Sequence, residues 1–294
     1  MEFFPNYPVG GDLQPGEWAR RMETQGWHGV CASDHLWVSS GYPHVFVAAT
    51  QMACATSRVR ITTSFCNNLF RSPVEFAQAA LSLQAASEGR FEAGLGAGWL
   101  EDEITAMGLD YPDGPERVSR YVEALKITRQ LLRTGQCQFS GEYYRVDIAG
   151  SRMLAGVSST PPPLVASAGG PRALREVTPL VDRVEIKASA RATRVGHLDF
   201  TIMASVTEAE VLDKAARVRA VSESVPMGVF LLVGCGPQAQ TMKAGLADGY
   251  LGRFFGEAQE VAANLLALQA AGIDRVQLTE AVPGSIEQLA GELL

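Results

Sequence analysis

Short apolar runs alternate with helix-like segments eight times along this chain of 294 residues, and this alternation constrains the fold most. Parallel strands joined by crossover helices are the economical arrangement for such an order. No linker and no change in composition divides the chain, so we expect one domain, residues 1–294, folded as a (β/α)8 TIM barrel. The expected strands are Met1–Asn6, Trp27–Ala32, Val59–Phe65, Phe91–Leu95, Leu164–Ala168, Val184–Lys187, Val225–Val233 and Arg275–Leu278.

A doubly wound open sheet is the second interpretation of the same alternation. Gly96-Ala97-Gly98 favours it little, because the turn lacks the third glycine of a dinucleotide-binding fingerprint and lies in mid-chain. After the fourth strand, a helix from Pro115 is followed by Gln136–Ile148, whose pattern predicts a small surface hairpin inserted after the fourth helix. From Ala188 to Phe200 the pattern is lost, and a helix is expected again over Thr207–Ser222.

Charge and cysteine content exclude several classes of function. The 25 basic and 32 acidic residues give a net charge of −7 and are spread without blocks, so no nucleic-acid partner is expected. The five cysteines are scattered and form no C-x-x-C, which predicts neither disulfides nor a metal site. No apolar run approaches the ~18 residues of a membrane span. We therefore expect a cytoplasmic protein with no membrane partner.

Active sites of (β/α)8 barrels lie at the carboxyl ends of the strands, which selects the candidate residues. His35 is the most reactive of them, because an imidazole exchanges protons near neutral pH and the adjacent Asp34 could orient it. The alternative is that Asp34 caps a helix and His35 packs. The other strand ends contribute Thr63, Ser64, Phe65, Ala97, Gly98, Trp99, Ser167, Ala168, Gly169, Gly170 and Lys187.

Three further features near these strand ends have structural and functional interpretations. Gly169-Gly170-Pro171 is typical of a turn whose backbone approaches an anion, or of a plain strand-to-helix turn. Trp37 and Trp99 could form the wall of a pocket for a planar molecule or pack in the core. The acids at 101–103 are interpreted as helix N-terminal residues favoured by the macrodipole. No metal site and no serine nucleophile is predicted.

Several of these motifs together resemble one family. The stretch from Glu88 to Trp99, together with Trp27–His35, Arg71-Ser72-Pro73 and Pro162–Arg172, is similar to the bacterial luciferase-like flavin-dependent oxidoreductases. The resemblance implies a barrel that holds FMN or the deazaflavin coenzyme F(420) at the strand ends. Ser33-Asp34-His35 looks like the motif of the coenzyme F(420) branch.

That resemblance implies roles for individual residues. Asp34 would contact the deazaflavin ring, and His35 would lie near the reacting centre. Thr63, Ser64, Ala97, Gly98 and Lys187 would line the cofactor site. Ser167, Ala168, Gly169 and Gly170 would bind or lead to its phosphate, and a cis peptide bond is expected near Thr63-Ser64. Trp37, Phe65 and Trp99 would meet substrate. Relatives often carry a glutamate in place of Trp99, so a more apolar substrate pocket is expected.

These inferences lead to a functional hypothesis with two alternatives. The chain is expected to be a coenzyme F(420)-dependent oxidoreductase that moves hydride between the deazaflavin and a small organic substrate, with reduction of a C=C or C=N bond suggested. The first alternative is an FMNH2-dependent monooxygenase. The second is a flavin-binding barrel without catalysis. By the same resemblance a homodimer is expected.

Overall fold

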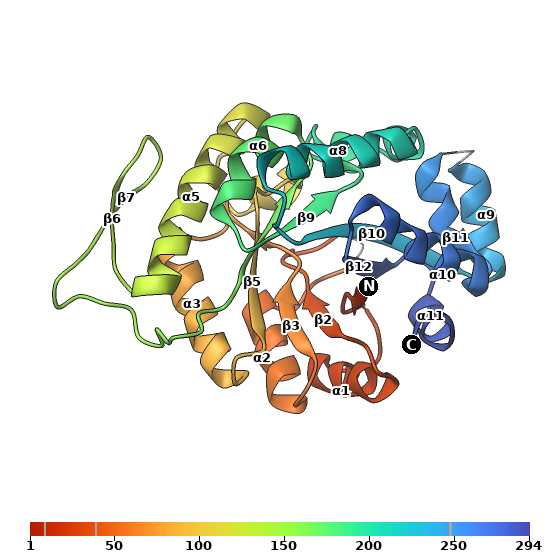
Figure 1. Cartoon of the computed structure of the whole chain (residues 1–294), viewed down its shortest axis with the longest axis horizontal. Helices are drawn as coiled ribbons and strands as arrows, with labels where there is room; N and C mark the ends of the chain where they lie inside the picture. The colour runs from red at the N-terminus through yellow and green to blue at the C-terminus, as the bar shows by residue number, and fades with distance from the viewer. Residues whose placement is uncertain (9, 39, 247–248) are drawn as a thin grey trace.

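Eight parallel strands form the body of the molecule in the computed structural model, which describes residues 1–8, 10–38, 40–246 and 249–294 (Figure 1). Their order along the sheet is β1-β12-β10-β9-β8-β5-β3-β2. A parallel bridge between Asn6 and Cys31 joins the two end strands, so the sheet closes on itself as a barrel. The strands are β1 Glu2–Pro5, β2 Gly29–Ala32, β3 Arg60–Thr63, β5 Phe91–Gly96, β8 Leu164–Ala168, β9 Arg183–Lys187, β10 Met227–Cys235 and β12 Arg275–Glu280.

All eight strands lie where the alternation predicts them, with ends that differ by a few residues. The third strand ends two residues early, because β3 ends at Thr63 and a cis peptide bond joins Ser64 to Phe65, one residue beyond the expected position. The chain then forms a two-residue strand, β4 Cys66–Asn67, which pairs with β5. A second short strand, β11 Phe255–Gly256, pairs with β10. The (β/α)8 barrel is therefore confirmed.

The helices lie around the barrel strands, as expected for crossover connections (Figure 1). The longest of them, α5, begins where the side chain of Asp113 accepts a hydrogen bond from the Glu116 amide at 2.8 Å, and it ends at Gly135 with a left-handed φ of 70°. The helices are α1 Pro15–Gln25, α2 Val45–Ala55, α3 Pro73–Ala86, α4 Glu101–Ala106, α5 Gly114–Thr134, α6 Pro171–Val177, α7 Phe200–Ala204, α8 Glu208–Val221, α9 Pro237–Gly245, α10 Ala258–Ala267 and α11 Ser285–Leu293, with 3-10 turns at Thr178–Leu180, Ala190–Thr193, Tyr250–Phe254 and Leu268–Ala271.

The predicted hairpin and the predicted helix near residue 207 are both present. Strands β6 Cys137–Ser140 and β7 Arg145–Ile148 pair antiparallel and project beyond α5 (Figure 1). Helix α8 begins with a capping box, in which the Thr207 hydroxyl accepts from the Glu210 amide and the Glu210 carboxylate accepts from the Thr207 amide. The segment without a sequence pattern contains a 3-10 turn at Ala190–Thr193 and the short α7.

The amino-terminal half of the barrel interior holds charged residues rather than a purely apolar core. Arg275 is buried and donates to both carboxylate oxygens of Glu92, at 2.6 and 3.0 Å. A second buried carboxylate, Glu185, lies 3.5 Å from the same guanidinium, and burial raises its pKa to about 7. Because this cluster lies near the strand starts, we relate it to stability rather than to chemistry. No helix in the described ranges is long and apolar enough to cross a bilayer.

Candidate active site

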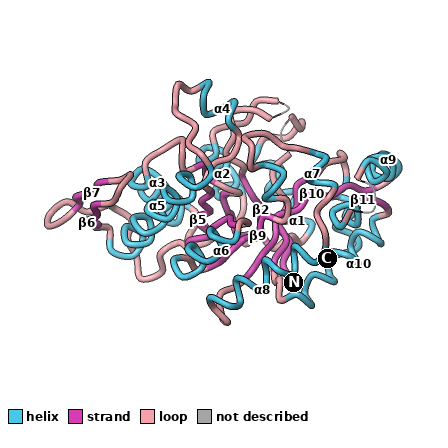
Figure 2. The backbone as a smooth tube through the Cα atoms, turned by 90° about the horizontal axis from the view of Figure 1, so that it is seen from above, coloured by secondary structure: helices cyan, strands magenta, loops and turns pink. Residues whose placement is uncertain are grey.

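The carboxyl ends of β2, β5 and β9 bring their following residues together at one end of the barrel. His35 follows β2, Trp99 follows β5, and Lys187 ends β9. The rings of His35 and Trp99 have centroids 5.6 Å apart, and the Lys187 ammonium lies 4.9 Å from the centroid of the Trp99 ring. Helix α4 and several loops lie together on one side of the barrel strands (Figure 2). Three of the residues that the sequence selects at the strand ends, His35, Trp99 and Lys187, therefore lie close together in the structure.

Glu103 of α4 holds the imidazole of His35. Its Oε1 lies 2.8 Å from Nδ1 of His35, and its Oε2 accepts the Leu36 amide at 2.9 Å. The Glu103 side chain is fully buried, whereas 17% of the His35 side chain is exposed. Tyr42 packs edge-on against His35, and burial and the Glu103 charge raise the pKa of that tyrosine. The pair is a buried carboxylate bound to a solvent-accessible imidazole.

This arrangement corrects one sequence-based interpretation and extends another. Asp34 does not orient His35, because the carboxylate that contacts the imidazole is Glu103. The interpretation of Glu103 as a helix N-terminal acid is confirmed, because it lies in the first turn of α4, and the structure adds its contact with His35. The acidic run at 101–103 held no local signal for this contact, because Glu101 and Glu103 each adjoin an apolar residue, Leu100 and Ile104. In the structure Glu103 and Ile104 are buried.

Asp34 instead connects the loop after β2 to the segment after β3. Its Oδ2 accepts the Asn67 amide at 2.7 Å, and its Oδ1 accepts from Nη2 of Arg71 at 3.1 Å, while Nη1 of Arg71 donates to Oδ2. Both side chains are nearly inaccessible to solvent, at 6% and 11%. Asp34 is thus a positioning residue for this rim, and its contact with a deazaflavin ring stays a prediction. Arg71 was not identified as a site residue from the sequence.

Thr63 and Ser64 are buried, and their hydroxyls form hydrogen bonds within the protein. The Thr63 hydroxyl donates to the Gly94 carbonyl at 2.7 Å and accepts from the Gly94 amide at 3.0 Å. The Ser64 hydroxyl donates to Oε1 of Gln277 at 2.5 Å, in the barrel interior. Any ligand at this strand end would therefore meet the backbone of these two residues. Their assignment to a cofactor site is left as a prediction.

The glycine-rich turns after β5 and β8 differ in how much space they leave. Gly98 has a φ of +80°, and a Cβ there would lie 2.4 Å from Oδ1 of Asn67. At Gly169 a Cβ would lie 2.8 Å from the Lys187 carbonyl, whereas at Gly170 it would meet no atom within 4 Å. Ala97 and Ser167 are partly exposed, and Ala168 is buried. Gly98 and Gly169 are thus required by packing, and only Gly170 leaves open space.

Apolar side chains surround the site on the side of the loop after His35. Trp37 is 38% exposed, and its indole N–H donates to Oδ2 of Asp102 at 3.0 Å. Phe65 is half-buried beside Gly96. The exposed apolar residues on the neighbouring loops are Leu36, Val38, Met107 and Leu109. Such a rim suits contact with the apolar part of a small molecule.

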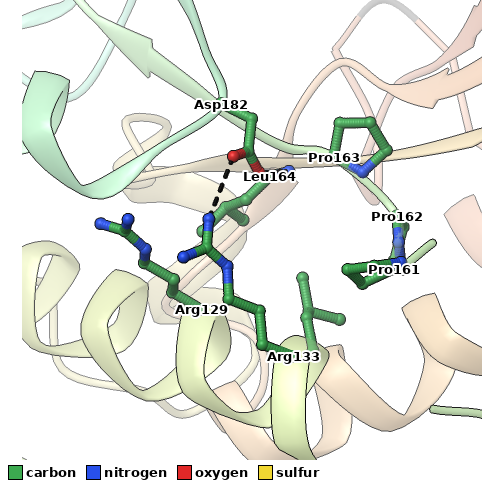
Figure 3. Close-up of a pocket in the computed structure, with 8 residues that line it drawn as sticks. Arg129, Arg133, Pro161, Pro162, Pro163, Leu164 and Asp182 are labelled. Carbon is green, nitrogen blue, oxygen red and sulfur yellow. Dashed lines mark hydrogen bonds and ion pairs between the residues drawn. The ribbon is translucent and has the colours of Figure 1, made fainter. Parts of the chain in front are cut away.

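Of two hollows in the described surface, one adjoins the site and the other does not. The first, of about 390 Å³, is lined by Arg71, Phe70 and Tyr144 among others, and so it borders the Asp34–Arg71 pair. The second, of about 240 Å³, lies at the opposite end of the barrel, between Arg129 and Arg133 of α5 and the prolines at 161–163 (Figure 3). Leu164 and Asp182, which precede or begin strands, line it. Within the described residues no group of three or more potential metal ligands occurs.

The fold and the site together define a (β/α)8 barrel with a carboxylate–imidazole pair at the carboxyl ends of its strands. Residues 14–197 match the model of the luciferase-like monooxygenase family, and the chain belongs to that family. It is 34% identical over 160 residues to an F(420)-dependent glucose-6-phosphate dehydrogenase of Amycolatopsis mediterranei (strain U-32), a match that covers 53% of this chain and 47% of that relative. The chain thus spans about half the length of the curated relatives it matches.

Solved structures share the barrel fold. An F(420)-dependent secondary alcohol dehydrogenase in complex with an F(420)–acetone adduct superposes with a TM-score of 0.76 at 19% identity, covering 99% of this chain and 97% of that chain. A monooxygenase from Streptomyces bottropensis superposes with a TM-score of 0.72 at 18% identity, covering 100% of this chain and 96% of that chain. At these identities the similarity establishes the fold.

Proposed function

We propose that this protein is a coenzyme F(420)-dependent oxidoreductase that transfers hydride between the deazaflavin and a small organic substrate. The observation that carries the proposal is the pair of His35 and Glu103 beside Trp99 at the carboxyl ends of the barrel strands. The name of the F(420)-dependent dehydrogenase relative and the resemblance of Ser33-Asp34-His35 to the F(420) branch favour the deazaflavin over FMN.

The residues at the strand ends fit a flat cofactor with an anionic tail. Gly98 has a backbone conformation that L side chains rarely adopt, and it leaves the backbone without a side chain between the partly exposed Ala97 and Trp99. The open space at Gly170 leaves the backbone accessible where α6 begins. By the sequence-based assignment, the deazaflavin ring would lie against the turn that contains Gly98, and the cofactor phosphate against the turn that contains Gly170. When bound, the deazaflavin supplies or accepts the hydride.

His35 would exchange the proton that accompanies the hydride. Because Glu103 accepts a hydrogen bond at Nδ1, the neutral imidazole carries its proton on Nδ1, and Nε2 is left as the basic nitrogen. Nε2 would take a proton from a substrate that is oxidised, or return it to a substrate that is reduced. The buried Glu103 carboxylate stabilises the imidazolium that forms, and it fixes the direction of the ring.

The substrate belongs to one of two chemical classes. The names of the dehydrogenase relative and of the secondary alcohol dehydrogenase point to an alcohol and its carbonyl product, for which a histidine base is suited. Reduction of a C=C or C=N bond, as suggested from the sequence, uses the same residues with His35 as the acid. Assays of both reaction types with the purified protein distinguish the two classes.

An FMNH2-dependent monooxygenase is the second candidate, and it is favoured by the family to which the chain belongs. The decisive experiment titrates the purified protein with oxidised and reduced coenzyme F(420) and, separately, with FMN. We expect tighter binding of the deazaflavin and no substrate-dependent oxygen consumption. Tight binding of FMN alone, with oxygen uptake, would contradict the proposal. If neither cofactor is turned over with any substrate, the flavin-binding barrel without catalysis is the better description.

A variant at His35 tests the role of the imidazole. His35→Ala is expected to lower turnover by about 10²- to 10⁴-fold, the usual contribution of a positioned acid or base, while coenzyme F(420) still binds. Full activity of this variant would exclude the role. We also propose a homodimer, as the resemblance implies, and light scattering of the purified protein measures it.

A further inference from the structure

Lys187 is a partly buried cation with no protein acceptor. It ends β9, and its ammonium rests on the face of Trp99, 4.9 Å from the ring centroid. Among the residues that the structure describes, no side chain or carbonyl forms a hydrogen bond or ion pair with its Nζ. Its Nζ is not among the fully buried polar atoms, so the ammonium is open to water or to a ligand. The burial, together with the charge of Arg117, lowers the pKa of Lys187 to about 7.

Arg117 is a second cation near Lys187, and it too lacks a carboxylate partner among the described residues. Arg117 of α5 is buried, and its guanidinium donates to the carbonyls of Pro112 and Arg194, at 2.7 and 3.2 Å, and stacks on the ring of Tyr111. Within the described ranges no carboxylate lies at ion-pair distance from it. Lys187 and Arg117 thus place two positive charges near each other at the mouth of the barrel, and the carboxylate of Glu101 acts on the same Tyr111 ring.

Trp99 connects Lys187 to the proposed acid–base residue. Its ring has Lys187 over its face and meets the His35 ring edge-on, with an interplanar angle of 76°. An anion bound to Lys187 would therefore lie one indole ring away from the imidazole. This distance suits a small molecule that is bound at one end by charge and reacts at the other.

We propose that Lys187, supported by the charge of Arg117, binds an anionic oxygen group, a carboxylate or phosphate, of the substrate whose reacting carbon faces His35. This inference rests on the proposed function, because His35 marks the reacting end only if the protein is the oxidoreductase described above. It modifies the expectation of an apolar substrate pocket: Trp99 supplies an apolar wall, and Lys187 adds a charge on its face. The phosphate of the cofactor is the other anionic group that would bind a lysine in this way.

Labelling of lysines in the cofactor-free protein tests the anion site directly. Lysines are acylated with a limiting reagent at neutral pH, with and without inorganic phosphate or acetate, and each site is quantified by mass spectrometry. We expect either anion to slow labelling of Lys187 about tenfold near saturation. Lys126, an exposed lysine of α5, is the internal control and should label at an unchanged rate. Equal labelling of Lys187 with and without both anions would overturn the proposal.

A second set of measurements separates the two sources of the anion. Lys187→Met removes the charge, Lys187→Arg retains it, and Lys126→Met is the matched control. If the anion belongs to the substrate, phosphate still protects Lys187 when coenzyme F(420) is bound, and Lys187→Met leaves the cofactor Kd within about twofold. If cofactor and phosphate compete and Lys187→Met weakens the cofactor about tenfold while Lys187→Arg does not, the assignment to substrate is overturned.

These results remain distinguishable from a failure of the proposed function. If the wild-type protein does not bind coenzyme F(420) but phosphate protects Lys187, the oxidoreductase proposal fails and the anion site stands. If coenzyme F(420) binds and Lys187 is not protected, the oxidoreductase proposal stands and the anion site fails. Because labelling uses the wild-type protein, the test also survives a Lys187→Met variant that does not fold.

Discussion

Oε1 of Glu103 and Nδ1 of His35 lie 2.8 Å apart although 68 positions of sequence separate the two residues. The carboxylate is contributed by a six-residue helix and the imidazole by the loop after β2. This pair fixes the tautomer of the imidazole and the direction of its free nitrogen.

Loss of the Glu103 charge should impair turnover without unfolding the protein. Glu103→Gln keeps the size of the side chain but removes the anion that stabilises the His35 imidazolium, so we expect turnover to fall about 10- to 100-fold. Coenzyme F(420) binding should change little. The matched control is Glu101→Gln, an exposed position in the same helix, which should retain wild-type turnover. Equal turnover of the two variants would show that Glu103 has no part in the reaction.

The buried pair of Asp34 and Arg71 should be strongly coupled in stability. Asp34→Asn leaves the Arg71 guanidinium without its main partner, and we expect a loss of about 3 kcal/mol in the free energy of unfolding. Asp34→Asn combined with Arg71→Met should cost less than the sum of the single variants, as measured by denaturant unfolding of all four proteins. Asp147→Asn, which breaks an ion pair with Arg152 whose side chains are 61% and 67% exposed, should leave the midpoint of denaturant unfolding nearly unchanged. An additive cycle at 34 and 71 contradicts the coupling.

Alanine substitutions at Gly98 and Gly170 should have different effects, the first on stability and the second on cofactor binding. Gly98→Ala forces a side chain into a backbone with φ of +80° and against Oδ1 of Asn67, so we expect it to destabilise the protein by about 1–3 kcal/mol. Gly170 has an ordinary φ of −85° and open space, so Gly170→Ala should leave the melting temperature unchanged. If the cofactor phosphate approaches this backbone, Gly170→Ala still raises the coenzyme F(420) Kd about tenfold. An unchanged Kd would remove Gly170 from the proposed cofactor site.

The carboxyl group of Glu185 should make stability depend on pH in an unusual direction. Burial raises its pKa from 4.5 to about 7. Between these pH values the folded protein holds a proton that the unfolded chain has released, so the contribution of Glu185 to the free energy of unfolding falls as the pH rises. From about pH 5 to about pH 8, wild type should lose up to about 3 kcal/mol more than Glu185→Gln in denaturant unfolding. The exposed control Glu142→Gln should follow wild type, and parallel profiles for wild type and Glu185→Gln would refute the assignment.

The strands and their number could be predicted because each is specified by a local pattern. Runs such as Phe91–Leu95 and Leu164–Ala168 are apolar, short and bounded by turn residues, and the helices between them leave few topologies other than a parallel barrel. The barrel in turn determines that His35, Trp99 and Lys187 lie at one end. The hairpin over β6 and β7 was predictable for the same local reason.

Only the tertiary structure decided which side chains meet. Sequence proximity suggested that Asp34 orients His35, but the position of α4 over the strand ends brings Glu103 to the imidazole, and Asp34 pairs with Arg71. Likewise, the contact of Lys187 with Trp99 and the absence of an acceptor for its ammonium in the described residues depend on how α5 and β9 pack. Local periodicity determines the elements, whereas contacts across tens of residues depend on helix position and rotation, which no local pattern encodes. The sequence by itself therefore determined the barrel and the end at which the site lies. The packing of α4 and α5 decided which charged side chains come together there.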